Sequence, residues 1–160
     1  MARSDQFALG IKLRKQGKLE ESRNLLVKLV TDCPNDPKIN YQCAWAHDVL
    51  GLEREAIPFY ERAIENGLSG HDLNGAFIGL GSSYRCVGKR DKAVQILRRG
   101  IEQFPSSRGI QVFLAMALHD QGSQGEAMRM LLRNLAETST DKEVVRYKKA
   151  ILFYADKFSE

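Results

Sequence analysis

The sequence predicts an all-α fold, a solenoid of four helix pairs that a further helix closes at the C-terminal end. Three observations support this fold class. One pattern of residues recurs four times at intervals of 34 or 37 residues. Within each copy, apolar residues recur every three or four positions, as they do on one face of an α-helix. Only four prolines occur in 160 residues, so there is room for long helices.

The repeat is marked first by glycines in matching contexts, at successive spacings of 34, 37 and 34 residues: Gly17, Gly51, Gly88 and Gly122. Other positions keep the same register: Gly10, Ala44, Gly81 and Ala115; Ser22, Ala56, Ala93 and Ala127; Leu26, Tyr60, Leu97 and Leu131. A single three-residue insertion near residues 69–73 accounts for the longer interval. Agreement of four kinds of position in one register indicates a true internal repeat.

Each repeat is expected to form two helices. The glycine ends the first helix, because a residue without a Cβ adopts the left-handed conformation at little cost. The second helix follows within a few residues, over 19–29, 54–64, 91–101 and 125–135 in the four repeats. So short a connection makes the two helices of a pair antiparallel neighbours. Gly, Ala or Ser stands where the two backbones approach closely.

The segment 141–158 is expected to form a single closing helix. Thr140, with Glu143 three residues later, matches a capping box at its start. Apolar residues then recur at spacings of three and four: Val144, Tyr147, Ile151, Tyr154 and Phe158. The first interpretation is a helix that covers the open end of the solenoid. The stripe is wider than one neighbouring pair requires, so the second interpretation is a dimer contact through Tyr147, Ile151, Tyr154 and Phe158.

The composition is that of an ordinary globular chain, 43% hydrophobic and 28% charged, with a net charge of +4. No apolar run approaches the roughly 20 residues that span a bilayer, and the first residues lack the apolar stretch of a signal peptide. Cys33, Cys43 and Cys86 are odd in number and form no Cys-x-x-Cys pair, which argues against a disulfide framework and a zinc site. We therefore expect a cytoplasmic protein without metal or cofactor.

The sequence contains no catalytic constellation, and we expect no enzyme. His47 falls at a core position of the repeat and is expected to be buried and hydrogen-bonded. His119 and Asp120 are adjacent, and adjacent residues on a helix do not face each other. There is no His-Glu-x-x-His motif and no phosphate-binding loop.

The period and the order of residue types resemble the tetratricopeptide repeat, whose pattern is W-x2-L-G-x2-Y, then A-x3-F, then P. The third repeat matches best, with Leu80-Gly81-x2-Tyr84, Ala93-x3-Leu97 and Pro105. The resemblance places the units at 3–36, 37–70, 74–107 and 108–140, in one domain over 1–160, and implies a right-handed α-α superhelix. Within the superfamily, the chain resembles a small bacterial subfamily of largely unassigned function.

The resemblance also implies that the first helices line a concave groove. Its groove positions carry aromatic and sulfur-containing side chains, types that interface cores favour: Tyr41, Trp45, Phe113 and Met116. Arg85 and Lys38 lie at the border of the groove. Two interpretations remain open, because these side chains either fill space between neighbouring helices or anchor a partner helix or peptide. The second makes the chain a non-enzymatic protein–protein interaction module or scaffold.

Charged residues bear on two other partners. Chaperone-binding relatives hold a C-terminal carboxylate with Lys, Asn and Arg, but the matching positions here carry residues such as Phe7, Ile11 and Gln42, so this partner is not expected. Basic residues cluster at 98–99, 129–133 and 146–149, and would attract RNA if they aligned on the outer face. The alternatives to groove binding are therefore homodimerisation through the C-terminal aromatic helix and RNA binding by the outer face.

Overall fold

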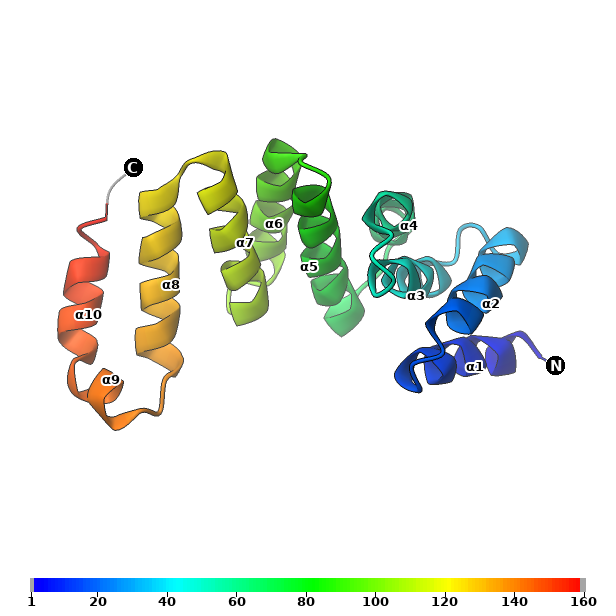
Figure 1. Ribbon diagram of the computed structural model, residues 1–160, viewed down its shortest axis with the longest axis horizontal. Coiled ribbons are helices and arrows are strands. Elements are labelled where there is room, and N and C mark those ends of the chain that lie inside the picture. The colour runs from blue at the N-terminus through cyan, green and yellow to red at the C-terminus, as the bar shows by residue number, and fades with distance from the viewer. Residues whose placement is uncertain (1, 159–160) are drawn as a thin grey trace.

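The computed structural model describes residues 2–158, and within that range every regular element is an α-helix (Figure 1). The ten helices of this range are α1 (Arg3–Lys15), α2 (Leu19–Asp32), α3 (Pro37–Asp48), α4 (Glu53–Glu65), α5 (Gly70–Cys86), α6 (Arg90–Gln103), α7 (Arg108–Gln121), α8 (Gln124–Thr138), α9 (Lys142–Arg146) and α10 (Lys148–Ala155). The first eight form four consecutive pairs, so the all-α solenoid is confirmed.

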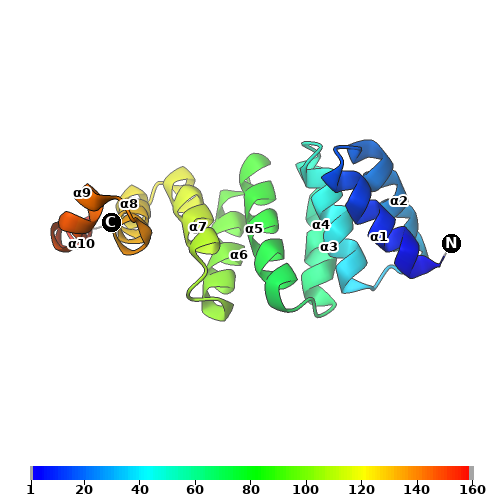
Figure 2. The same cartoon turned by 90° about the horizontal axis from the view of Figure 1, so that it is seen from below.

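The pairs stack along an elongated body, with the N-terminus and the C-terminal helices at opposite ends (Figures 1 and 2). The two helices of each pair contact each other, and each second helix also contacts the first helix of the next pair. The first helices α1, α3, α5 and α7 contact one another in succession, and Figure 2 shows them side by side. We call the surface that these four helices present the first-helix face.

Glycine ends the first helix of every pair, as the sequence predicts. The φ values lie in the left-handed region: +78° at Gly17, +72° at Gly51, +77° at Gly88 and +101° at Gly122. The amide after each glycine donates to the carbonyl five residues before it, as Lys18 does to Leu13 at 3.0 Å. This bond satisfies a carbonyl that the helix end would otherwise leave unpaired. The same turn therefore sets the same antiparallel geometry four times.

The three-residue insertion lengthens a helix rather than a loop. Helix α5 runs for 17 residues, against 12 to 14 in the other three first helices. Gly67 lies in the turn before it and Gly70 is its first residue, with φ values of +87° and +62°. The insertion is thus absorbed as about one extra turn at the N-terminal end of α5, and the repeat register from Ala76 onward is kept.

Small residues allow the two helices of a pair to approach closely. Gly81 is buried against the second helix of its pair, where an added Cβ would lie 2.5 Å from Cγ of Leu97. About one helical turn before Gly81, Phe77 is fully buried on α5 and packs edge-on to the ring of Phe104. The main apolar core runs through the second, third and fourth pairs, and a smaller cluster joins the first pair to the second.

The C-terminal tail differs from the single helix that the sequence predicts. Helices α9 and α10 meet at Tyr147, whose φ and ψ of −97° and 8° interrupt the helix. The residue that caps α9 is Asp141, whose carboxylate accepts the amides of Glu143 and Val144 at 2.9 and 3.1 Å. The predicted capping box at Thr140 is therefore wrong. A carboxylate at this place also interacts favourably with the positive end of the helix dipole.

Helix α10 packs against α8 and so covers the last pair, which agrees with the capping interpretation. Ala155 is buried, and Ile151 and Leu152 are half-buried in this contact. Asp156, beyond the helix, pairs with Arg133 at 3.2 Å. The predicted apolar stripe is only partly buried, because its aromatic side chains Tyr147, Tyr154 and Phe158 remain exposed, as does the neighbouring Phe153.

Candidate partner-binding site

Two hollows open on the first-helix face. The N-terminal hollow, of about 440 Å³, lies between α1 and α3 and is lined by Ile11, Arg14, Lys15, Leu19, Gln42, Trp45 and Val49. The C-terminal hollow, of about 350 Å³, lies over α5, α7 and α8 and is lined by Arg85, Ala115, Met116, His119, Asp120, Gln124, Ala127, Met128 and Leu131. Three of the six residues predicted for partner binding line one or the other: Trp45, Arg85 and Met116.

Trp45 is the most exposed large apolar side chain of the predicted site, with 41% of its surface accessible. The guanidinium of Arg14 lies 4.0 Å from the centre of its ring, a cation–π contact. Arg14 is itself fixed, because it donates to the side-chain oxygen of Gln42 at 2.6 Å and to the Gln42 carbonyl at 3.3 Å. The indole is therefore held in one orientation while much of its surface stays open.

Tyr41, predicted as the second anchor, does not belong to the accessible surface, because only 6% of it is exposed. Its ring centre lies 5.9 Å from that of Trp45 and 6.2 Å from that of Tyr60. The ring fits because Gly75 on α5 lacks a Cβ, which would overlap the Tyr41 hydroxyl. The prediction of a contact surface made by Tyr41 is thus wrong, and Tyr41 supports Trp45 from within the core.

A half-buried carboxylate ties α3 to its neighbours in the middle of the first-helix face. Asp48 accepts hydrogen bonds from the hydroxyls of Tyr60 and Ser83 at 2.9 and 3.2 Å. Tyr60 reaches this place because Gly79 lacks a Cβ, which would overlap the tyrosine ring. Burial raises the pKa of Asp48, although both hydrogen bonds oppose the rise. The carboxylate therefore serves to join two pairs of the solenoid.

The stability of the Asp48→Asn variant relative to the wild type is expected to be greater at pH 7 than at about pH 4. A raised pKa means that the folded protein holds this proton more tightly than the unfolded chain does. The ionised form therefore lowers the free energy of unfolding above the folded-state pKa, and this cost disappears once both states are protonated. Urea unfolding of both proteins from pH 4 to 7 measures it. A constant difference across that range would contradict the assignment.

The C-terminal hollow combines an ion pair with methionine and leucine side chains. Arg85 donates through Nε to Asp120 at 2.7 Å and through Nη1 to the sulfur of Met116 at 3.6 Å. The bond from Arg85 lowers the pKa of Asp120 below its usual value. Met128 and Leu131 on α8 complete the apolar wall and are exposed. The sequence analysis did not predict these two residues as part of the site. Their exposure depends on where α10 packs on α8, and α10 leaves both side chains uncovered.

Besides Tyr41, two residues predicted for partner binding lie outside both hollows, Phe113 and Lys38. Phe113 is half-buried and packs against the main apolar core, so it serves the space-filling role that the sequence left open. Lys38 is exposed in the first turn of α3, where its backbone amide donates to the N-capping carboxylate of Asp36 at 2.9 Å. Of the four aromatic and methionine residues predicted for the site, Trp45 and Met116 are the two that line a hollow.

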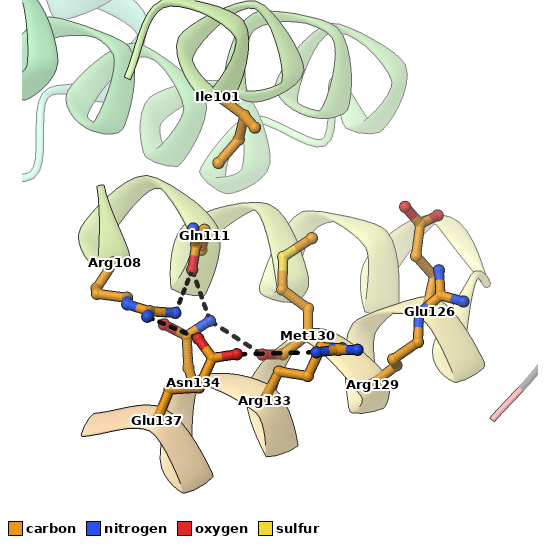
Figure 3. Close-up of a pocket in the computed structure, with 9 residues that line it drawn as sticks. All are labelled: Ile101, Arg108, Gln111, Glu126, Arg129, Met130, Arg133, Asn134 and Glu137. Carbon is orange, nitrogen blue, oxygen red and sulfur yellow. Dashed lines mark hydrogen bonds and ion pairs between the residues drawn. The ribbon is translucent and has the colours of Figure 1, made fainter. Parts of the chain in front are cut away.

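A third hollow, of about 260 Å³, is lined by residues of α6, α7 and α8 (Figure 3). Here carboxylates engage two of the basic residues on which the RNA hypothesis rested, Arg98 and Arg133, and one outside those clusters, Arg108. Glu137 pairs with Arg108 at 2.6 Å and with Arg133 at 3.7 Å. Glu126 pairs with Arg98 at 2.9 Å. Acidic side chains thus interrupt the predicted basic patch.

Cys43 and His47 lie one helical turn apart, with Sγ and Nδ1 separated by 3.8 Å, an approach that the sequence analysis did not single out. The same Nδ1 lies 2.8 Å from the Cys43 carbonyl oxygen. Since a carbonyl only accepts, that nitrogen carries the proton and cannot remove one from the thiol. Burial also raises the pKa of Cys43 to about 12. The histidine is buried and hydrogen-bonded, as predicted, and the pair is unsuited to nucleophilic chemistry.

Within residues 2–158, no group of three or more His, Cys, Asp and Glu side chains is placed to hold a metal ion. In the same range, no helix has both the length and the apolar character needed to cross a membrane.

Four helix pairs in one register, with the same glycine turn and a shared face of first helices, define an α-α repeat protein. A family model described as "Tetratrico peptide repeat" matches residues 37–158, which are the last three pairs and the tail. The chain belongs to the tetratricopeptide repeat family. The first pair lies outside the match but shares the register of the others.

A curated relative extends the similarity to nearly the whole chain. The aspartyl/asparaginyl beta-hydroxylase of Mus musculus is 27% identical over 157 residues, which cover 93% of this chain. The chain spans only 21% of the length of that protein. The similarity is therefore confined to about a fifth of the hydroxylase.

Solved structures share the fold at low sequence identity. A crystal structure of MamA has a TM-score of 0.77 at 16% identity and covers 98% of this chain and 87% of its own. YrrB, described as a TPR protein with an unusual peptide-binding site, has a TM-score of 0.72 at 17% identity, over 97% and 78% of the two chains. The pilF protein of Pseudomonas aeruginosa has a TM-score of 0.70 at 14% identity, over 98% and 72%.

Proposed function

We propose that the protein is a cytoplasmic, non-enzymatic scaffold that binds a partner protein on its first-helix face, with Trp45 as the principal anchor. The observation that carries this proposal is the accessible indole, held in place by Arg14 at the edge of a hollow. Tryptophan is among the residues most enriched at energetically dominant positions of interfaces. An exposed and oriented tryptophan presents its surface without a large loss of side-chain freedom on binding.

Two further features support a partner rather than a small substrate. The C-terminal hollow adds Met116 on α7 and, beside it, Met128 and Leu131 on α8. Methionine surfaces adapt to different partner side chains. Both hollows are open rather than enclosed, which suits an extended peptide or a helix. The peptide-binding site described for YrrB, a protein of the same fold, is consistent with this proposal.

The Trp45→Ala variant is expected to recover at least about tenfold less partner from the source lysate than the wild-type chain, since tryptophan anchors contribute about 2 kcal/mol or more. Its thermal unfolding is expected to stay close to that of the wild type, because the side chain is partly exposed. Immobilised chains and quantitative mass spectrometry of the captured proteins measure the effect.

The matched control is Val27→Ala, which removes an exposed apolar side chain from α2, outside the first-helix face. Recovery by this control is expected to equal that of the wild type. If Trp45→Ala folds and captures the same proteins at the same level as the wild type, the first-helix face is not the binding surface.

Self-association is a second candidate function, favoured by the uncovered aromatic side chains of the tail. Tyr147, Phe153 and Tyr154 are each more than half exposed, and apolar groups that remain in water on a folded surface are typical of association sites. Sedimentation velocity in the tens-of-micromolar range tests this function. A dimer that dissociates in the Tyr154→Glu variant is expected, and a wild-type monomer at those concentrations would contradict it.

A further inference from the structure

Arg14 is the most deeply buried arginine of the first-helix face, and its guanidinium has no acidic partner within residues 2–158. Only 9% of its surface is exposed. Among the residues that the structure describes, no carboxylate lies within 4 Å of its nitrogens, and its hydrogen bonds go to the neutral side chain and the carbonyl of Gln42. The carboxylate of Asp48, at the end of α3, accepts its hydrogen bonds from Tyr60 and Ser83.

Four other arginines differ from Arg14, because each of them forms an ion pair with a carboxylate. Arg85 pairs with Asp120, Arg98 with Glu126, and both Arg108 and Arg133 with Glu137. Each of these guanidinium groups is more exposed than Arg14 and yet has a carboxylate. Burying a charge without a counter-charge is unfavourable, and burial lowers the pKa of Arg14 accordingly. The fold therefore keeps one desolvated positive charge uncompensated beside Trp45.

The N-terminal hollow has the composition to receive a counter-charge together with an apolar group. Lys15 adds a second, exposed cation, and the lining contains no acidic residue. Its remaining walls are largely apolar, formed by Ile11, Leu19 and Val49 beside the indole. The two bonds to Gln42 use two of the five donors of a guanidinium, so Arg14 retains donors for a further acceptor.

We propose that the N-terminal hollow binds an acidic side chain of a partner protein next to a bulky apolar one, with the carboxylate on Arg14 and Lys15 and the apolar group against Trp45. This inference rests on the proposed function and specifies the chemistry of the partner. Guanidinium–carboxylate pairs in partly desolvated places are short and directional. The C-terminal hollow differs in charge, because Asp120 already neutralises Arg85. The two ends of the face therefore select different side chains.

The full chain is tested against a display library of random dodecapeptides, and the selected peptides are measured by fluorescence polarisation. Binders are expected to carry Asp or Glu beside Leu, Ile, Phe or Trp. Lys15→Glu is expected to weaken them about tenfold, because a like charge then opposes the carboxylate. Lys12→Glu makes the same charge change on an exposed, non-lining site of α1 and is expected to change affinity less than about twofold. Arg14→Gln is expected to weaken binding at least about thirtyfold.

The outcomes separate the two proposals. Binders that require Trp45 but lack acidic residues and tolerate Lys15→Glu would overturn this inference and leave the proposed function intact. A selection without binders that require Trp45 would contradict both. Arg14→Gln alone does not decide the matter if it fails to fold, whereas Lys15 is exposed and its variant keeps the core. Equal binding of a single-stranded RNA oligomer, lost in the same variants, would also overturn the inference, because the hollow would then recognise phosphate.

Discussion

Replacing Phe77 by alanine is expected to lower the free energy of unfolding by about 3–5 kcal/mol, the range found for large aromatic side chains in well-packed cores. Phe77 is fully buried on α5 and packs edge-on to Phe104. It also lies against Gly100, where an added Cβ would be 3.1 Å from Phe77. The side chain therefore lies where α5 and α6 pack together. Its removal leaves a cavity that the surrounding residues fill only partly.

The control for this prediction is Phe153→Ala, the same truncation at a site that is 58% exposed. Its effect is expected to stay within about 0.5 kcal/mol. Urea unfolding followed by circular dichroism at pH 7 compares the two variants with the wild type. A loss at Phe77 no larger than that at Phe153 would contradict the assignment of the main core.

Replacing Gly81 by alanine is expected to destabilise the protein by about 1–3 kcal/mol, whereas the same change at Gly10 is expected to lie within about 0.5 kcal/mol of neutral. Both glycines occupy the same position of the repeat, which is alanine in the second and fourth units. A Cβ at Gly81 would lie 2.5 to 2.7 Å from three atoms of the buried Leu97. At Gly10 the nearest atoms, of Leu26, are 3.0 Å away.

The gain in helix propensity from glycine to alanine, about 0.5–1 kcal/mol, acts equally at the two sites. The difference between the variants therefore reports the closeness of the helix pair alone. Thermal and urea unfolding of both proteins measure it. A Gly81 variant as stable as the Gly10 variant would show that the third pair can separate to admit a methyl group.

The repeat and its turns could be predicted from the sequence because they depend on local chemistry. A glycine such as Gly88 after an apolar helical stretch identifies a left-handed helix end wherever it stands. Apolar spacing then assigns the buried face of each helix. These two signals are independent of the neighbouring units, so they located the eight paired helices and the buried His47.

The site was predicted less well, because accessibility depends on what neighbouring units lack. Tyr41 occupies a groove position of its own helix, but Gly75 on α5 leaves the space in which its ring is buried. Met128 and Leu131 look like core residues in the periodic pattern, yet they are exposed because α10 packs elsewhere on α8. In the tail, the aromatic stripe is continuous in sequence, whereas the helix breaks at Tyr147. None of these three features is indicated by the residues close to it in the sequence.

Trp45 is the only tryptophan of the chain, and this allows one measurement to test partner binding at the first-helix face directly. Protein labelled with 5-fluorotryptophan gives a single fluorine NMR signal from this side chain, which tryptophans of an unlabelled partner cannot obscure. The signal is expected to shift when the captured partner is added to saturation, because the indole leaves water. A complex that forms fully in sedimentation while the Trp45 signal stays unmoved would contradict binding at this face.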